Sequence, residues 1–306
     1  MGKIAYVFSG QGAQKVGMGK SLYDIGGAAK KIYDEAESLR PGTKEQSFSG
    51  NDEDLKLTIN TQPCLYLVDL SAALSLEENG IKAEAVAGFS LGEIAALAYA
   101  KAYSHADGFK IVTKRGKLMH EASSGIDSAM CAVLKLDADT IVNTAQKYEK
   151  LYAVNFNCPG QTVVSGLKTS LEAFEGEIRE LGGRCVPLAV SGAFHSPFME
   201  DASNEFKKEL QGYKINKPEI PVYSNYSAEP YDAEITETLA MQMKSPVRWQ
   251  ETIENMITEG FTDFIEVGAG KTLCGLIKKI SKEVRVYSVE DEETLKTTIE
   301  AVKENA

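Results

Sequence analysis

Apolar residues follow two alternating patterns along nearly the whole chain. Short apolar runs of strand length, such as residues 4–8 and 85–89, alternate with longer segments whose apolar residues recur every three or four positions, as in residues 61–79. Near the C-terminus the same alternation predicts two strands, at residues 263–267 and 284–288, and two helices, at residues 271–280 and 292–303. Strands that alternate with helices predict an α/β protein with a mainly parallel sheet.

One stretch departs from this alternation. Its predicted order is strand, helix, strand, strand, helix, strand, at residues 129–136, 138–148, 152–156, 162–165, 171–181 and 184–190. This β-α-β-β-α-β order is that of ferredoxin-like folds. We therefore predict a small ferredoxin-like domain at residues 122–189, inserted into a large discontinuous domain of residues 1–121 and 190–306, with the functional site in the cleft between them.

The composition is that of a globular protein with an excess of acidic residues. Of the 306 residues, 43% are hydrophobic and 25% are charged, which excludes disordered, collagenous and coiled-coil chains. The 33 Lys and Arg residues against 44 Asp and Glu residues leave a formal net charge of −11. Because nucleic acids and anionic membranes attract basic surfaces, we expect neither as a partner.

The five cysteines, at positions 64, 131, 158, 185 and 274, show no pairing pattern. No two of them have the C-x-x-C spacing of a zinc or redox site, so we expect small core residues and no metal. The N-terminal segment lacks the long apolar region of a signal peptide, and the most apolar window carries Glu93 and is too short to span a bilayer. These features predict a cytoplasmic protein.

The strongest local signal is GFSLG at residues 88–92, which matches the G-x-S-x-G nucleophile elbow of α/β-hydrolase-like domains. A predicted strand precedes it and a predicted helix, residues 91–102, follows it, as the motif requires. Side chains at the two glycine positions would clash in the sharp turn that lifts Ser90 Oγ out of the sheet. The N-terminus of the helix would favour a developing negative charge. The alternative is an ordinary glycine-flanked turn.

A serine nucleophile needs a base, and the chain has three histidines. His105 lies in a loop where a helix starts, and His120 falls at the end of a predicted helix, where a cation interacts favourably with the helix dipole. His195 follows a predicted strand and precedes a predicted helix, and catalytic groups of open α/β folds gather at such strand ends. His195 is therefore the favoured base, and a hydrogen-bonded loop histidine is the alternative.

No acidic side chain is well placed to complete a Ser-His-Asp triad. In α/β-hydrolases the acid comes between the serine and the histidine in the sequence. The acids between Ala122 and His195 fall in the predicted small domain, which is a poor position from which to support the imidazole. The pattern does not favour a standard hydrolase, and another group is expected to orient His195.

Two glycine-rich turns match nucleotide-binding loops only in part. Residues 9–14 (SGQGAQ) follow the first strand, but Lys15 stands where G-x-G-x-x-G needs its third glycine. Residues 268–272 (GAGKT) have Ile265 where the Walker A loop needs its first glycine. A nucleotide-binding oxidoreductase or ATPase is therefore disfavoured. The first turn could instead offer a backbone N–H group to an oxyanion.

Taken together, these segments resemble the malonyl-CoA:acyl carrier protein transacylases of fatty acid synthesis. The landmarks run in family order across nearly the whole chain, as FSGQGAQ (8–14), GFSLGE (88–93), RGKLM (115–119), NFNCPGQTVVSG (155–166), GAFHSPFM (192–199), PVRW (246–249) and EVGAGKTL (266–273). The resemblance implies that Ser90 becomes malonylated and that His195 is its general base. It also implies that the backbone N–H groups of Gln11 and Leu91 form an oxyanion hole.

The resemblance changes the interpretation of Arg115. The helical run KRGK at residues 114–117 by itself favours a solvated basic face over a clamp for a carboxylate, whereas the resemblance implies that Arg115 holds the free malonyl carboxylate. It further implies that a backbone carbonyl, here matched to Gln242, orients the imidazole. Phe89 departs from the family, which usually has histidine before the nucleophile, and Phe194 fits the malonyl-type pattern.

The implied reaction is a ping-pong transfer from malonyl-CoA to the phosphopantetheine thiol of holo acyl carrier protein, in a monomer without metal or redox cofactor. The alternatives are a trans-acting polyketide-type acyltransferase, a serine esterase or thioesterase that uses water, and a non-catalytic carrier-binding module. Carrier proteins are typically acidic, as is this chain, so docking would need a local basic patch. The candidates for that patch are Lys114, Lys117, Lys278 and Lys279.

Overall fold

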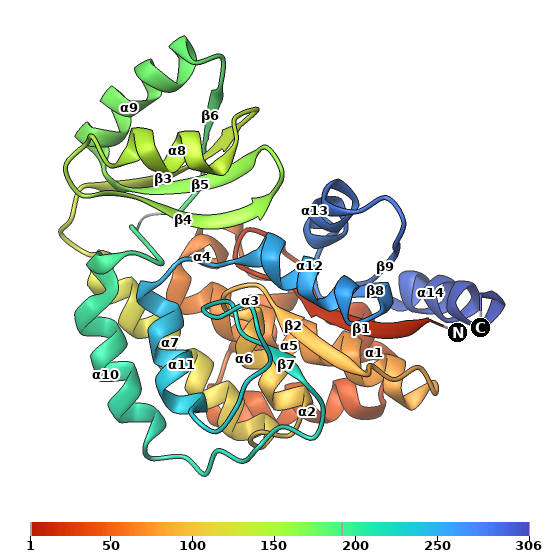
Figure 1. Cartoon of the computed structure of the whole chain (residues 1–306). Helices are drawn as coiled ribbons and strands as arrows, with labels where there is room; N and C mark the ends of the chain where they lie inside the picture. Colours follow the sequence, from red (N-terminus) through yellow and green to blue (C-terminus); the bar gives the residue numbers. More distant parts are fainter. Residues whose placement is uncertain (1, 191, 306) are drawn as a thin grey trace.

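A five-stranded sheet, sheet A, forms the centre of the larger part of the molecule in the computed structural model, which describes residues 2–190 and 192–305 (Figure 1). Its strands lie in the order β7-β2-β1-β8-β9, and all neighbours are parallel. They are β1 (Lys3–Phe8), β2 (Ala85–Gly88), β7 (Val222–Tyr223), β8 (Phe261–Val267) and β9 (Arg285–Val289). The predicted parallel α/β sheet is confirmed.

The central strand β1 shows how sheet A is buried on both faces. Its side chains alternate between the faces, as in any strand. Tyr6 and Phe8 pack into a hydrophobic cluster with residues of helices α5 (Thr58–Glu78) and α6 (Gly92–Tyr99). Ala5 and Val7 pack into a second cluster with residues of α12 (Trp249–Thr258) and α13 (Thr272–Ile280). Helices thus cover both faces, which explains the continuous apolar run of this strand.

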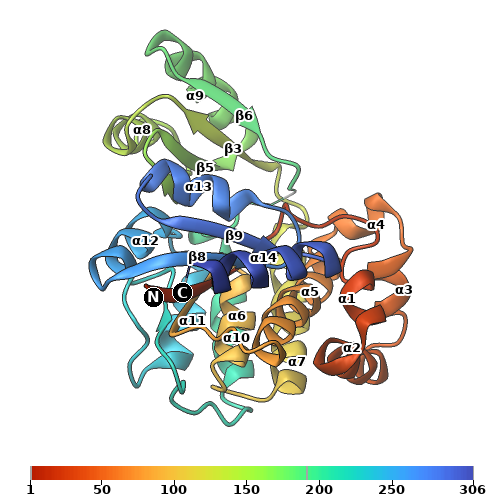
Figure 2. The ribbon, with the colours of Figure 1, turned by 90° about the vertical axis from the view of Figure 1, so that its right-hand side faces the viewer.

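A second sheet, sheet B, is antiparallel and has the strand order β4-β5-β3-β6. It is built from β3 (Ser128–Leu134), β4 (Leu151–Cys158), β5 (Gln161–Leu167) and β6 (Arg184–Pro187), with α8 (Ala138–Ala145) and α9 (Lys168–Glu180). This is the predicted ferredoxin-like arrangement, and Figures 1 and 2 show it beside the part that contains sheet A. All its elements fall between residues 122 and 189, although the domain limits themselves stay a prediction.

The remaining helices surround sheet A or link its strands. They are α1 (Lys20–Ile25), α2 (Gly27–Leu39), α3 (Thr43–Phe48), α4 (Asp52–Lys56), α7 (His105–Ser123), the 3-10 helix η1 (Pro197–Met199), α10 (Glu200–Leu210), α11 (Ile235–Lys244) and α14 (Glu292–Glu304). Among the described residues, no helix combines the length and the apolar character needed to cross a membrane.

Candidate active site

The turn between β2 and α6 holds Ser90 in a left-handed backbone conformation, with φ of 54°. A Cβ atom at Gly88 would lie 2.0 Å from the backbone carbonyl carbon of Gly92, and one at Gly92 would lie 2.4 Å from the carbonyl oxygen of Phe8. Neither position can therefore hold a side chain unless the backbone moves. The sharp strand-to-helix turn predicted from the glycines is present, and its cause is this close approach of backbone segments.

Ser90 Oγ lies 2.7 Å from His195 Nε2. On the other side of the ring, His195 Nδ1 lies 2.9 Å from the backbone carbonyl oxygen of Gln242. A carbonyl oxygen only accepts hydrogen bonds, so Nδ1 carries the proton and Nε2 is free to accept the hydroxyl proton of Ser90. A backbone carbonyl thus occupies the place that a carboxylate has in a Ser-His-Asp triad.

The imidazole of His195 is held in a nearly water-free position. The residue is 4% exposed, and its backbone N–H donates to the carbonyl oxygen of Met243 at 3.2 Å. Burial lowers the pKa of His195 to about 4, and the positive charge of Arg115 acts in the same direction. The imidazole is therefore neutral at pH 7, the state in which it can accept a proton.

Arg115 lies next to Ser90 and is fully buried, although it stands between lysines on α7. Its guanidinium donates to Gln62 Oε1 at 2.9 Å, to Gln242 Oε1 at 2.7 Å and to Ser90 Oγ at 3.1 Å. Its Nε is buried and has no hydrogen-bond partner among the described residues. The solvated basic face favoured by the run KRGK alone is therefore wrong for Arg115, because the side chain points into the protein.

A buried carboxylate, Glu93, lies behind this group. It accepts hydrogen bonds from the backbone N–H of Asn225 at 2.8 Å, from Gln242 Nε2 at 3.2 Å and from the hydroxyl of Tyr231. Burial raises the pKa of Glu93 to about 7, while these hydrogen bonds and the charge of Arg115 act in the opposite direction. The Gln242 amide thus connects Glu93 on one side with the guanidinium of Arg115 on the other.

Replacing Glu93 by Gln should remove one pH-dependent contribution to stability. Because the pKa of Glu93 is higher in the folded than in the unfolded state, its contribution is greatest below pH 4 and is lost as the pH rises through about 7. Relative to Glu93→Gln, the wild type should lose on the order of 2 kcal/mol of unfolding free energy between pH 5 and pH 8. Urea denaturation of both proteins at the two pH values measures this, and a pH-independent difference would contradict it.

The loop after β1 lies against the turn that carries Ser90. A Cβ atom at Gly10 would lie 2.8 Å from the carbonyl oxygen of Phe89, so the two turns touch. Within the described part of the chain, the backbone N–H groups of Gln11 and Leu91 donate to no other residue. The side chain of Gln11 donates to Thr58 Oγ1 at 3.1 Å, which fixes this loop on α5. Among the described residues, two backbone donors without a partner therefore lie on adjoining turns beside Ser90.

A cavity of about 220 Å³ extends from these turns toward sheet B. It is lined by the loop at residues 10–13 and Phe89 on one side and by Asn155, Asn157 and Leu188 on the other. The side-chain oxygens of Asn155 and Asn157 are buried without a hydrogen-bond partner among the described residues. The cavity therefore lies between the two sheets, with two buried asparagines on its sheet B side.

Phe89 packs against Trp249 in an edge-to-face arrangement, with ring centroids 5.4 Å apart. Trp249 is fully buried, and Phe89 also lines the cavity. Phe89, the residue that departs from the family pattern, is thus held by an aromatic contact with a buried side chain. It leaves the contacts of Ser90 Oγ with His195 and Arg115 in place.

The chain matches the acyl transferase domain family over residues 5–303. It belongs to that family. This acyl transferase is 41% identical to the malonyl CoA-acyl carrier protein transacylase of Bacillus subtilis, over 99% of this chain and 98% of the relative. It is similar in structure to the malonyl CoA-acyl carrier protein transacylase from Clostridium perfringens, with a TM-score of 0.94, 38% identity and coverage of 99% and 98% of the two chains.

A third similarity comes from a complex with a carrier protein. In it, the acyl-carrier protein of a type II polyketide synthase is bound to its malonyl-transacylase. The acyl transferase has a TM-score of 0.94 with that structure at 31% identity, and the match covers 98% of this chain and 99% of the other.

The four candidate docking lysines of the acyl transferase lie on two separate helices. Lys114 and Lys117 are on α7. Lys114 Nζ lies 3.6 Å from Glu209 Oε2, and Lys117 Nζ lies 3.8 Å from Glu121 Oε1. Lys278 and Lys279 are on α13, which Figures 1 and 2 show well away from α7. The four lysines therefore do not form one continuous patch, and the docking surface stays a prediction.

Proposed function

We propose that this protein transfers a malonyl group from malonyl-CoA to the phosphopantetheine thiol of holo acyl carrier protein. The observation that carries the proposal is the position of Ser90 Oγ, which lies 2.7 Å from a neutral imidazole and 3.1 Å from a buried guanidinium. The first group can activate the serine, and the second can bind the carboxylate that distinguishes malonyl from acetyl. Relatives named as malonyl CoA-acyl carrier protein transacylases support the same substrates.

In the first half-reaction Ser90 Oγ adds to the thioester carbonyl carbon of malonyl-CoA while His195 Nε2 takes the hydroxyl proton. The backbone N–H groups of Gln11 and Leu91 donate to the resulting oxyanion, and loss of one such donor typically costs about 10²–10³ in rate. When the C–S bond breaks, His195 returns the proton to the sulfur and CoA leaves as the thiol. The malonyl group is then an ester of Ser90.

The second half-reaction reverses these steps with a different thiol. The phosphopantetheine thiol gives its proton to His195 Nε2 and adds to the carbonyl carbon of the malonyl ester. When the tetrahedral species collapses, Ser90 Oγ leaves and takes back the proton from His195. The carbonyl of Gln242 holds the imidazole in one tautomer throughout, since its bond to Nδ1–H stabilises the imidazolium that forms.

The guanidinium of Arg115 would pair with the free carboxylate of the malonyl group. A fully buried cation with an unpartnered N–H group carries a desolvation cost that an arriving carboxylate offsets. An acetyl group offers no such partner, so the same contacts select against it. Within this network the buried carboxyl group of Glu93 lies on the far side of Gln242 from the guanidinium.

The acylation rate should fall at acid pH as His195 becomes protonated. With a pKa of about 4 for His195, acylation of Ser90 should not depend on this group between pH 6 and pH 8, and should fall about tenfold per unit below pH 4. Rapid-quench measurement of acylation across this range tests the expectation. If the acylation rate instead fell below about pH 6.5 in both the wild type and Glu93→Gln, the imidazole would have an ordinary pKa.

The same chemistry leads to proposals on cofactor, assembly and location. The thioester is already activated and every step is an addition, an elimination or a proton transfer, so the transfer requires no metal or redox cofactor. Ser90, His195 and Arg115 all come from one chain, which fits a monomer. Every cysteine among the described residues is a free thiol, which fits the reducing cytoplasm.

The proposal is tested by following labelled malonyl-CoA with and without holo acyl carrier protein. Without the carrier we expect label on the enzyme alone, and with the carrier we expect label on the carrier with little free malonate. A serine thioesterase, the competing function, would release free malonate at the same rate in both cases. Release of free malonate without a carrier would therefore contradict the transferase function.

A further inference from the structure

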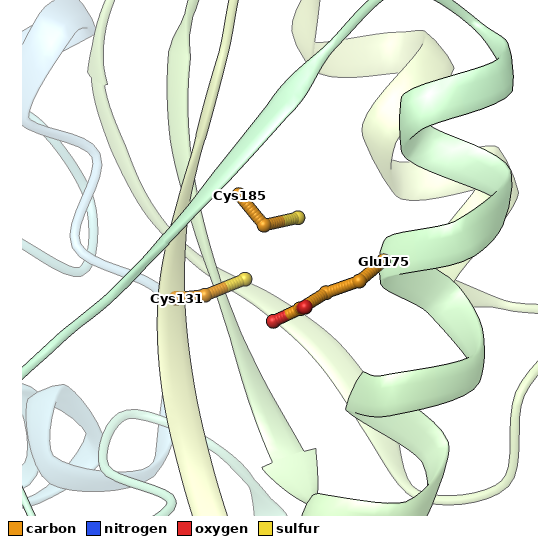
Figure 3. Close-up of side chains that lie close together, drawn as sticks. All are labelled: Cys131, Glu175 and Cys185. Atoms are coloured by element: carbon orange, nitrogen blue, oxygen red, sulfur yellow. The ribbon is translucent and has the colours of Figure 1, made fainter.

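Two cysteines and a glutamate meet in the part of the molecule that contains sheet B. Among the described residues, the Sγ atoms of Cys131 and Cys185 and a carboxylate oxygen of Glu175 lie within 4.8 Å of one another. Figure 3 shows the two thiols and the carboxylate directed toward one point, from β3, β6 and α9. None of these residues belongs to the site around Ser90.

The strand register brings the two thiols together. Cys131 on β3 pairs with Pro187 on β6, and Val133 pairs with Cys185, so the two cysteines are diagonal neighbours on one face of sheet B. Both pack with a hydrophobic cluster that includes residues of α8 and α9. Because the two cysteines are 54 positions apart, their spacing in the sequence gives no sign of this contact, and the expectation of no metal rested on that spacing.

We propose that Cys131, Cys185 and Glu175 bind a thiophilic divalent cation such as Zn²⁺. Two thiolates and a carboxylate are a donor set that zinc takes in tetrahedral coordination, with water in the fourth position. At a Zn–S distance of about 2.3 Å, two sulfurs of a tetrahedral site lie about 3.8 Å apart. The present separations therefore need only small side-chain movements. On binding, the two thiol protons pass to solvent.

Burial and access fit a structural ion that can enter from solvent. Cys131 is fully buried, whereas Cys185 and Glu175 are half-buried. Glu175 lies on α9 beside the buried Phe174, and Figure 3 shows its side chain directed from the helix toward the two thiols. A disulfide would use the two sulfurs and leave the convergent carboxylate without a role, which is why a cation is the favoured occupant.

The ion would join three elements that precede His195 in the chain. It would tie β6 to β3 and to α9, and β6 ends at Pro187, in the segment that leads to His195. A ligand that binds only the folded state raises the unfolding temperature. Its role would be to stabilise sheet B and this connection, without participation in acyl transfer.

The test uses the full-length protein, stripped with a chelator and kept in a phosphine reductant, and titrates it with Co²⁺ as a spectroscopic probe. We expect one Co²⁺ per chain with a thiolate-to-metal charge-transfer band in the near ultraviolet, and displacement by Zn²⁺. Cys185→Ser and Cys131→Ser should lose the band and weaken binding at least about 100-fold. Cys158→Ser, a cysteine of the same sheet outside the cluster, should bind as the wild type does.

Glu175→Gln separates a metal site from a reactive pair of thiols. With Co²⁺ it should keep the charge-transfer band, because both thiolates remain, but it should bind Zn²⁺ about tenfold or more weakly. Zn²⁺ should raise the unfolding temperature of the wild type but not of Cys185→Ser. The proposal is wrong if the wild type binds no stoichiometric Co²⁺, if Cys185→Ser retains the band, or if Glu175→Gln binds Zn²⁺ as tightly as the wild type. Cys185→Ser, at the half-buried position, keeps the test valid if Cys131→Ser fails to fold.

Discussion

Replacement of Ser90 by Ala should abolish malonyl transfer, and replacement of His195 by Ala should lower it by about 10³-fold. Without Ser90 Oγ no ester can form, so the covalent route is closed. Without the imidazole, the serine hydroxyl keeps its ordinary, very weak acidity, and a positioned general base typically contributes about 10²–10⁴ in rate. Donors of the oxyanion hole remain in the His195 variant and leave it a residual activity.

These two variants are compared by the steady-state rate of malonyl transfer to holo acyl carrier protein. The matched control for His195→Ala is His120→Ala, a histidine near the end of α7, and we expect it to retain wild-type rates. Circular dichroism checks that each variant is folded. Equal losses in the two histidine variants, or a His195→Ala protein with nearly full activity, would contradict the assignment of the base.

Replacement of Arg115 by Ala should lower kcat/KM for malonyl-CoA by about 10³-fold and should lower that for acetyl-CoA far less. A buried polar group built for one partner discriminates strongly against an analogue that lacks it, and charge-assisted bonds to a desolvated carboxylate are the strong ones. Because Arg115 also contacts Ser90, Gln62 and Gln242, some loss with both substrates is expected. The ratio of the two kcat/KM values isolates recognition of the carboxylate.

Competition between malonyl-CoA and acetyl-CoA for acylation of the enzyme measures this ratio directly. Arg115→Lys keeps the charge but not the fork of donors, so it should restore only part of the preference. Lys114→Ala, at a half-buried position next to Arg115 and paired with Glu209, is the matched control and should leave the ratio unchanged. Equal losses with both substrates would show that Arg115 supports the fold of the site and does not bind the carboxylate.

Local close approach is the feature of this site that sequence patterns predict best. A Cβ atom at Gly88 would lie 2.0 Å from the backbone of Gly92, a constraint that acts within five residues, whereas one at Gly92 would lie 2.4 Å from the backbone of Phe8 at the end of the neighbouring strand. The order of elements in and around sheet B is likewise predicted, because apolar residues recur there with the period of a strand or of a helix. By contrast, β7 contains only Val222 and Tyr223, which is too short for any period to appear.

Long-range contacts account for what the sequence did not predict. Arg115 is fully buried while Lys114 beside it is only half-buried, because neighbouring helical positions face different sides of α7. Gln62 and Asn225 reach Arg115 and Ser90 from distant segments, and no spacing rule connects them. Glu93 is the residue whose position in the sequence could have indicated this buried polar network, because a carboxylate inside an apolar helix needs hydrogen-bond partners when it is buried.

The central claim is that acyl transfer passes through an ester on Ser90, and mass spectrometry of the enzyme after brief reaction with malonyl-CoA tests it most directly. We predict that the peptide containing Ser90 gains about 86 Da, the mass of a malonyl group that replaces a hydroxyl proton. Addition of holo acyl carrier protein should remove this mass, and Ser90→Ala should never acquire it. A malonylated Ser90→Ala protein, or a modified wild-type enzyme that keeps its label in the presence of the carrier, would contradict the account.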